Sequence, residues 1–281
     1  MNYTPSTMTT AKTILFPTDF SERANQALAQ AIFFAQQLDA KLIIYHAYHR
    51  PVVPGGTPEQ IAKSLIEFEK HIDLSFEELL RSKESLKDID YEFIKELGVS
   101  VENIINVSKK GVVDLIMLAT KGAKGIDELW GTKAARIINE VDIPVLVIPD
   151  NATLDSISKV GIVCDYSKET YYNSLDTLLG IMDTMGLNAD VVTLNRNDKA
   201  MSTEELAYRQ LVRKKLEAVP TSFHFTFDGH VDEGIIKYSL DNNIGMVVIL
   251  PKSYGFIESI FHESLTQQMA YHSPLPLLVL K

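Results

Sequence analysis

An internal repeat is the feature that most constrains how this chain can fold. Residues 12–21 (KTILFPTDFS) and 158–167 (SKVGIVCDYS) are both β-rich runs that close on Asp, an aromatic residue and Ser. Self-similarity of this kind indicates two copies of one structural unit rather than a single large domain.

The ends of the two copies correspond as well. The apolar run 113–119 parallels 245–251, and 143–149 parallels 275–281. Both pairs lie the same distance apart along the chain, so no insertion falls between them. We therefore expect two domains, residues 1–150 and 151–281, each near the usual domain size of about 100–150 residues. The linker is short, so the domains should pack against each other.

Each copy alternates short β-branched runs with helical periods, which is typical of βαβ units and a parallel sheet covered on both faces. The expected fold class is α/β, with two doubly wound, five-stranded, mostly parallel sheets. The expected strands are residues 13–17, 41–47, 90–96, 112–118 and 143–148 in the first copy and 159–163, 189–194, 222–227, 245–250 and 276–280 in the second.

Two helix starts can be predicted from capping residues. Ser21 is a candidate N-cap for a helix whose apolar face carries Leu28, Ile32, Ala35 and Leu38. After a Pro- and Gly-rich loop over 50–56, residues 57–60 (TPEQ) combine an N-cap, a proline at the first helical position and a capping-box Gln. The apolar positions expected to face the core in that second helix are Ile61, Leu65, Phe68, Ile72 and Phe76.

Charge and apolar content exclude several classes of protein. The formal net charge of -10 disfavours a surface built to bind nucleic acid or anionic lipid. No apolar run approaches the ~20 residues needed to span a bilayer, and residues 1–11 lack the apolar core of a secretory signal. Cys164 is the only cysteine, which fits a reducing compartment. We expect a cytoplasmic protein that is not bound to a membrane.

Candidate ligand-binding residues follow the expected strands. In open α/β sheets, ligands bind beyond the carboxyl ends of the strands, and phosphates favour glycine-rich turns that lead into helices. Pro17, Thr18 and Asp19 follow the first strand, and the loop 119–125 (ATKGAKG) follows the fourth, ahead of a helix opened by residues 131–132 (GT). This pattern is compatible with phosphate binding and equally with plain turns.

Taken together, the run 14–21 (ILFPTDFS), the strand end 43–47 (IIYHA), the glycine loop, residues 131–132 and the run 143–148 (IPVLVI) resemble the universal stress protein family, here as a tandem pair. The resemblance implies an adenine nucleotide alpha hydrolase-like, Rossmann-like fold. ATP-binding members of the family carry Gly-x2-Gly-x9-Gly-[Ser/Thr] after the fourth strand, with the phosphates in that loop. Their adenosine is held by the Asp after the first strand and by the end of the second.

Carried over residue by residue, the resemblance implies one adenine-nucleotide site in the first copy, for ATP or AMP, with Mg²⁺ where ATP binds. Ala119 replaces the first glycine of the family pattern, and the segment between Gly122 and Gly131 is one residue shorter than in the pattern. The implied site residues are Pro17, Thr18, Asp19, Ala47, Leu118, Ala119, Gly122, Gly131, Thr132 and Lys133.

The second copy has lost most of the pattern. Pro251, Tyr254 and Glu263 stand where the first copy has Ala119, Gly122 and Gly131, and a carboxylate in a phosphate cradle would repel the ligand. Asp165 and Ser264 remain of the pattern. We expect this copy to be a degenerate partner that supplies packing surface.

Members of the family commonly dimerise through their last strand. By that resemblance, residues 143–148 and 275–280 should pair within one chain and form an intramolecular pseudo-dimer. The chain would then be a monomer or a dimer of tandem chains.

The preferred function is an adenine-nucleotide-responsive stress protein with no dedicated catalytic residues and at most slow ATP hydrolysis. One alternative is a protein-interaction scaffold of the same family that binds an unknown partner without nucleotide. A less favoured alternative is an enzyme that uses the same strand-end pocket. Structural roles are expected for Cys164, His46 and Trp130, and no histidine has metal-ligand spacing.

Overall fold

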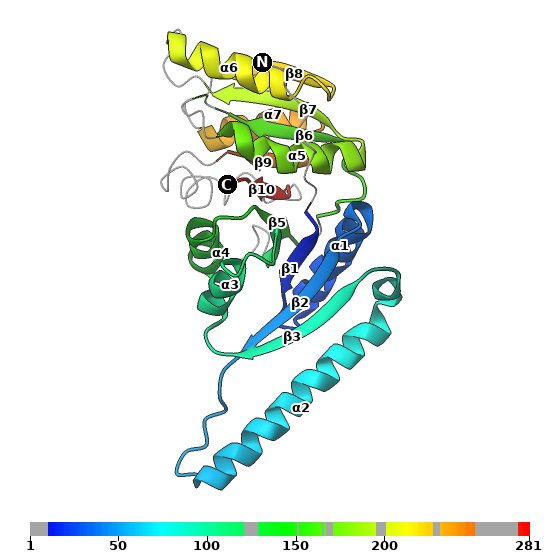
Figure 1. Cartoon of the computed structure of the whole chain (residues 1–281), viewed down its shortest axis with the longest axis vertical. Helices are drawn as coiled ribbons and strands as arrows, with labels where there is room; N and C mark the ends of the chain where they lie inside the picture. The colour runs from blue at the N-terminus through cyan, green and yellow to red at the C-terminus, as the bar shows by residue number, and fades with distance from the viewer. Residues whose placement is uncertain are drawn as a thin grey trace.

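A computed structural model describes residues 11–120, 129–150, 152–164, 166, 171–194, 201–226, 231–250 and 275–281. Its strands form one continuous sheet, shown in Figure 1, in the order β3-β2-β1-β4-β5-β10-β9-β6-β7-β8. The strands are β1 (Thr13–Pro17), β2 (Lys41–Tyr48), β3 (Tyr91–Leu97), β4 (Leu115–Thr120), β5 (Val145–Pro149), β6 (Lys159–Val163), β7 (Asn188–Leu194), β8 (Thr221–Thr226), β9 (Met246–Ile249) and β10 (Leu277–Val279). The helices are α1 (Glu22–Leu38), α2 (Pro58–Ser82), the 3₁₀ turn η1 (Glu84–Asp88), α3 (Ser100–Ser108), α4 (Leu129–Glu140), α5 (Tyr171–Met185), α6 (Thr203–Lys215) and α7 (Val231–Asp241).

The sheet consists of two parallel halves joined by one antiparallel contact. In that contact Leu277, Leu278 and Val279 of β10 pair with residues of β5, and Leu278 lies opposite Leu146. The α/β class, the mostly parallel strands and the pairing of the last strands are as predicted. The two expected sheets are halves of one sheet because the junction strands hydrogen-bond directly. Since β5 and β10 are antiparallel, the carboxyl ends of the strands in the two halves lie at opposite edges.

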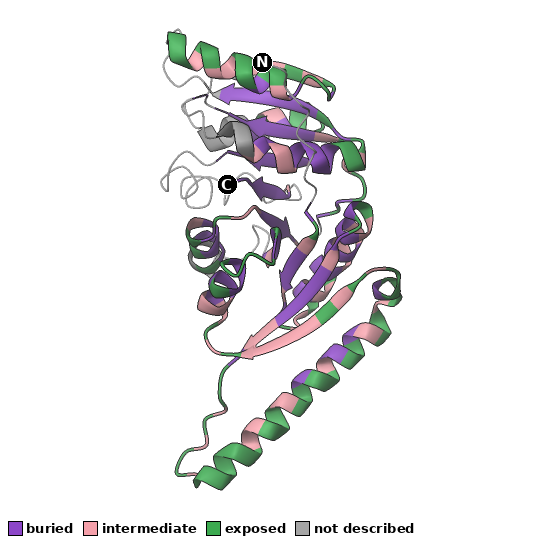
Figure 2. Cartoon of the chain, viewed as in Figure 1, coloured by how far each residue is buried: buried purple, intermediate pink, exposed green. Residues whose placement is uncertain are grey.

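Helices cover both faces of the sheet, and each face has its own apolar core. Helices α1, α2, α5 and α6 contribute buried side chains to one core, and α3, α4 and α7 contribute to the other. Figure 2 shows the central strands buried beneath these helices. No helix formed by the described residues is both long and apolar enough to cross a membrane.

Helix α1 begins where the sequence predicts. The Ser21 hydroxyl accepts a hydrogen bond from the backbone N–H of Ala24 at 3.2 Å, which satisfies a donor left free in the first helical turn. All four apolar residues expected on the inner face are buried against the sheet: Leu28, Ile32, Ala35 and Leu38.

Helix α2 also begins as predicted, but it extends past the sheet. Thr57 and Gln60 form the expected capping box. Of the predicted inner positions Ile72 and Phe76 are buried, whereas Ile61 is 37% and Phe68 40% exposed. The expectation that the whole apolar stripe faces the core is therefore wrong for the first turns, because the helix outruns the sheet edge (Figures 1 and 2).

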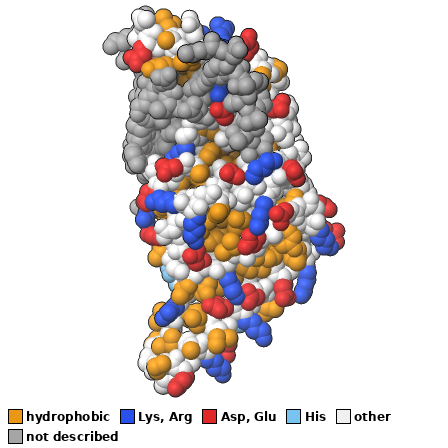
Figure 3. Space-filling model, in the orientation of Figure 1, with side chains coloured by type: hydrophobic (Ala, Val, Ile, Leu, Met, Phe, Trp, Pro, Cys, Tyr) orange, Lys and Arg blue, Asp and Glu red, His pale blue; other side chains and the backbone are white. Residues whose placement is uncertain are grey.

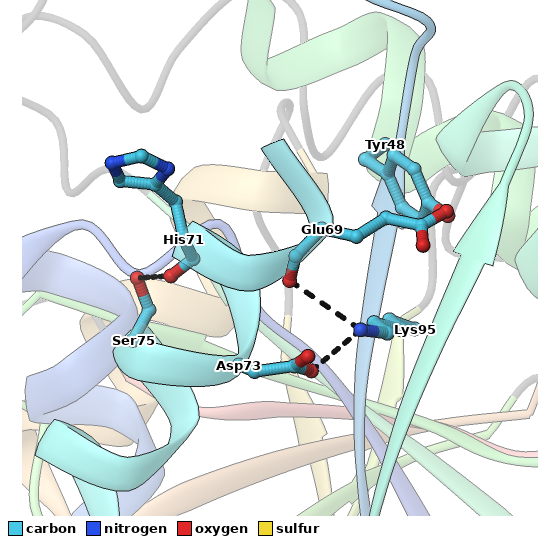
Figure 4. Close-up of polar contacts among 6 residues, drawn as sticks. All are labelled: Tyr48, Glu69, His71, Asp73, Ser75 and Lys95. Atoms are coloured by element: carbon cyan, nitrogen blue, oxygen red, sulfur yellow. Dashed lines mark hydrogen bonds and ion pairs between the residues drawn. The ribbon is translucent and has the colours of Figure 1, made fainter. Parts of the chain in front are cut away.

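Polar contacts hold α2 against the edge of the sheet (Figure 4). Lys95 of β3 places its ammonium 2.6 Å from the carboxylate of Asp73 and 3.4 Å from the carbonyl oxygen of Glu69. The Tyr48 hydroxyl donates a hydrogen bond to the Glu69 carboxylate. Burial and this carboxylate raise the pKa of Tyr48 to about 12, so the phenol stays protonated at neutral pH.

The fourth strand starts later than residues 112–118 predict. Asp114 lies before β4, and its side chain accepts hydrogen bonds from the backbone N–H groups of Lys12 and Thr13, both at 2.9 Å. The backbone N–H of Asp114 also donates to the carbonyl oxygen of Thr13, and regular strand pairing begins at Leu115, opposite Ile14.

Backbone geometry repeats between the halves. Phe20 and Tyr166, the aromatic residues of the two Asp-aromatic-Ser turns, both adopt left-handed backbone conformations, with φ of 60° and 54°. Few non-glycine residues adopt this conformation, so its recurrence at matching positions supports a structural repeat. Gly111 after α3 and Asn243 after α7 also have positive φ, 69° and 55°, at matching positions of the two halves.

Candidate functional site

A cavity of about 530 Å³ lies at the carboxyl ends of β1, β2 and β4. It sits where the strand order turns back, between β1 and β4, which is the position at which open α/β sheets bind ligands. Its lining residues come from these strand ends and from α1, α3 and α4: Pro17, Thr18, Asp19, Ser21, Arg23, Ala24, Tyr45, His46, Ala47, His49, Ser100, Val101, Ile104, Leu118, Ala119, Thr120, Lys133, Ala134 and Ile137.

The structure brings most of the predicted site residues together in this cavity wall. They are Pro17, Thr18, Asp19, Ala47, Leu118, Ala119 and Lys133. Gly122 lies outside the described residues. Gly131 and Thr132 belong to the first turn of α4, which begins two residues before the predicted helix start.

The turn after β1 is held by its own side chains. Thr18 accepts a hydrogen bond from the backbone N–H of Phe20 at 3.0 Å, and Asp19 accepts one from the backbone N–H of Ser21 at 3.0 Å. Burial raises the pKa of Asp19, but hydrogen bonds from Ser21 and the nearby charge of Arg23 outweigh it and leave this pKa below its usual value. Asp19 is therefore an ionised hydrogen-bond acceptor in the cavity wall.

His46 has a structural role in the same turn. Its Nδ1 lies 2.8 Å from the carbonyl oxygen of Thr18, and its ring packs 4.6 Å from the ring of Phe20. These contacts connect the end of β2 to the end of β1. The expectation that His46 makes a structural hydrogen bond agrees with this geometry.

The phenol of Tyr45 forms part of the cavity wall and stays neutral. Burial and the neighbouring carboxylate of Glu96, 2.5 Å from the hydroxyl, raise the pKa of Tyr45 well above its usual value. This tyrosine cannot serve as a base near neutral pH. Its ring and the side chains of Val101, Ile104 and Leu118 give the cavity an apolar side.

Sequence reasoning missed several lining residues. Arg23 follows the predicted N-cap Ser21, and His49 follows the predicted site residue Ala47. Ser100 and Ile104 belong to α3. One signal could have revealed the α3 residues: Gly98 directly follows β3, with φ of 145°, and marks a turn at the same sheet edge as the other strand ends. Arg23 offered no local signal, because its place depends on how α1 packs.

The corresponding edge of the second half is only partly described. Cys164 follows β6, is 2% exposed and forms no disulfide, in keeping with the expected structural role. Tyr166 is buried beside it. Asp165, Pro251, Tyr254, Glu263 and Ser264 lie outside the described residues, and nothing is described of the side chain of Trp130.

The first cavity offers groups of several chemical kinds to a ligand. It combines an apolar side with the acceptor Asp19, hydroxyl groups, and the cations of Arg23 and Lys133. Within the part of the chain that the structure describes, no three His, Cys, Asp or Glu side chains gather closely enough to hold a metal ion.

Comparison with known proteins agrees with this architecture. A sequence model of the Universal stress protein family matches residues 10–149. Universal stress protein Slr1230 of Synechocystis is 24% identical over 293 residues, spanning 96% of this chain and 100% of its own length. Universal stress protein MJ0531 of Methanocaldococcus jannaschii is 31% identical over 141 residues, spanning 49% of this chain and 81% of its own length.

Among solved structures, a universal stress protein from Archaeoglobus fulgidus superposes with a TM-score of 0.70 at 16% identity. The match covers 96% of this chain and 98% of that chain, so the same fold extends over both halves. The family model matches residues 10–149, and the two relatives match 49% and 96% of this chain. The chain therefore belongs to the universal stress protein family.

Proposed function

We propose that this protein binds one adenine nucleotide, ATP or AMP, in the cavity of its first half. It would act in the cytoplasm as a nucleotide-responsive regulatory protein. One observation carries the proposal: most of the residues that the family pattern selects by sequence line a single cavity at the switch point of the sheet. The parallel order of β2, β1 and β4 brings these strand ends to one edge, and Lys133 of α4 joins them there.

Each part of the cavity suits one part of the ligand. An adenine ring would lie against the apolar wall, and the ionised Asp19 would accept hydrogen bonds from ribose hydroxyls. The cation of Lys133 stands on α4, in the same helix as Gly131 and Thr132, where the family pattern places the phosphates. Mg²⁺ would accompany ATP on its phosphates.

The surface charge favours binding of a small ligand over binding of a polyanion such as nucleic acid. The net charge is -10, and on the face shown in Figure 3 acidic and basic side chains are interspersed over the described residues. Nucleic-acid binding needs clustered cations, because it depends on neutralising many phosphates. Cys164, the single cysteine of the sequence, is buried, which fits a reducing compartment.

The two halves would then have different tasks. We assign residues 1–150 to a nucleotide-binding domain and 151–281 to a domain that supports it through the β5–β10 junction. Substitution of the phosphate-binding pattern in the second half supports one ligand per chain. The proposed activity is binding, because Asp19, Tyr45 and His46 of the cavity wall are each engaged in hydrogen bonds within the protein.

Thermal unfolding of the nucleotide-stripped chain tests the proposal. A ligand that binds only the folded state at a hundred times its Kd stabilises it by about 2.7 kcal/mol. Saturating ATP with Mg²⁺, or AMP, should therefore raise the Tm by several degrees. An Ala47→Trp variant, which fills the cavity, should lose this shift.

The matched control is Ala62→Trp, which places the same side chain at an exposed position of α2. It should keep the full nucleotide-dependent shift. If neither nucleotide raises the Tm of the unmodified chain at millimolar concentration, the proposal is wrong and a protein-interaction scaffold becomes the better account. In that case the altered glycine pattern at Ala119 would mark a lost nucleotide site.

A further inference from the structure

Arg23 lies between two hollows of the first half. It stands in the first turn of α1 and lines the main cavity together with Asp19 and Lys133. It also lines a smaller hollow of about 200 Å³, whose wall includes Gln26, Pro149 and Asp150. Its side chain therefore connects the candidate site to the chain that leaves β5.

Asp150 fixes the position of this guanidinium. The Nε of Arg23 lies 2.9 Å from Oδ1 of Asp150, and both atoms are shielded from solvent. Neither atom has a hydrogen bond of good geometry to any described group, so the contact is an ion pair through one nitrogen. A guanidinium carries five N–H donors in a planar fork, and the ion pair leaves the terminal ones for another acceptor.

The backbone keeps this pair in place. Asp150 directly follows β5, and the next part of the connection is tied to α1 because the N–H of Leu154 donates to the side chain of Gln30 at 2.7 Å. Arg23 is thus held between α1 and the junction rather than extending into solvent, and its side chain is 36% exposed. Little rotamer entropy remains to be lost when it binds an anion.

The charges in the cavity favour an anionic group. Asp19 is the one acidic side chain in the described wall, and Arg23 and Lys133 line the same cavity. Arginine remains charged at all accessible pH values and matches phosphate geometry with two parallel N–H groups. Two cations against one carboxylate give the described wall a net positive formal charge, which attracts an anionic ligand.

We propose that Arg23, oriented by Asp150, recognises the phosphate part of the ligand and makes the site selective for adenine nucleotides over adenosine. This inference rests on the proposed function and adds a recognition residue outside the glycine pattern. Asp150, at the start of the connection to the second half, and the bound phosphate would then both contact the guanidinium of Arg23. Occupancy of the site is thereby linked to the junction of the two halves.

Titration calorimetry with ATP·Mg²⁺, AMP and adenosine, on the unmodified chain and on Arg23→Gln, tests the inference. The variant should bind ATP and AMP at least tenfold more weakly while its Kd for adenosine changes less than twofold. Arg23→Lys should recover part of the loss, because it keeps the charge but not the fork. Asp150→Asn keeps the Arg23 cation but removes its ion-pair partner, so it should weaken the binding of ATP by a smaller factor.

Arg23→Gln leaves the carboxylate of Asp150 without its ion-pair partner, so the double variant Arg23→Gln/Asp150→Asn serves as the control for folding. It should show the same selective loss of nucleotide at an unchanged Tm. Equal weakening of adenosine and ATP would reduce Arg23 to a structural role, and unchanged affinity for all three ligands would overturn the inference while nucleotide binding stands. Failure of the unmodified chain to bind any of them would overturn both.

Discussion

At the scale of single residues, the sequence predicts what local chemistry determines. Pro17, Thr18 and Asp19 line the cavity as expected, because a strand end and the turn after it are defined within a few residues. Arg23 could not be predicted, since its position depends on Asp150, which is distant in the sequence. Pairings of this kind become visible only once the helix is packed on the sheet.

The pH dependence of stability tests the electrostatics of Asp19. A carboxyl group with a lowered pKa in the folded state stabilises it above the unfolded pKa, and that contribution disappears as the pH falls through the folded value. Asp19→Asn should therefore unfold more easily than the unmodified chain at pH 7, and the difference should shrink as the pH falls toward 3. Urea unfolding across this range measures it; a constant difference would show that Asp19 gains nothing from its hydrogen bonds with Ser21.

Ala119 offers a second prediction at this scale. It stands at the end of β4, in the cavity wall, where the family pattern has glycine. Ala119→Gly should bind ATP more tightly, because removal of the methyl group lets the backbone approach the ligand more closely. The same change should lower the free energy of unfolding by about 0.5–1 kcal/mol, since glycine weakens a strand. Looser binding in the variant would mean that the methyl group contacts the ligand favourably.

At the scale of elements, the helix starts marked by capping residues are predictable and helix burial is not. Ser21 and Thr57 cap α1 and α2 as their sequences indicate, because capping involves only neighbouring residues. The exposure of Ile61 and Phe68 depends instead on where the sheet ends, which no periodicity within α2 reveals. The same applies to Asp114, whose side chain contacts the start of β1 across a long stretch of sequence.

The two caps should differ in their effect on stability. Loss of an N-cap hydroxyl costs about 1 kcal/mol of helix stability. Because α1 is packed along its length, Ser21→Ala should lower the global free energy of unfolding by about that amount. Thr57→Ala should instead increase hydrogen exchange in the first turns of α2 and leave the Tm nearly unchanged, since those turns are exposed. Equal Tm losses would show that the projecting end of α2 unfolds together with the core.

At the scale of the whole molecule, the sequence repeat and the family resemblance predict two α/β halves joined by their last strands. The structure confirms that pairing, and β5 and β10 make the sheet continuous. The register of the junction could not be predicted, because both strands are apolar throughout and their sequences fit more than one alignment. As a result of the antiparallel contact, the carboxyl ends of the strands in the two halves point in opposite directions.

The junction should contribute strongly to stability. Leu278 of β10 is fully buried opposite Leu146 of β5. Leu278→Ala should lower the free energy of unfolding by about 2–5 kcal/mol, as expected for a cavity in a packed core. Leu74→Ala, at a position 49% exposed on α2, should change it by less than about 0.5 kcal/mol. Urea unfolding compares the two, and similar small losses would indicate that the halves do not depend on their junction.

The most direct test of the central claim is the stoichiometry of nucleotide binding. Titration calorimetry of the nucleotide-stripped chain with ATP·Mg²⁺ should give one site per chain, absent in Ala47→Trp and retained in Ala62→Trp. Two sites per chain, undiminished binding by Ala47→Trp, or no binding by the unmodified chain would contradict a single nucleotide site in the first half.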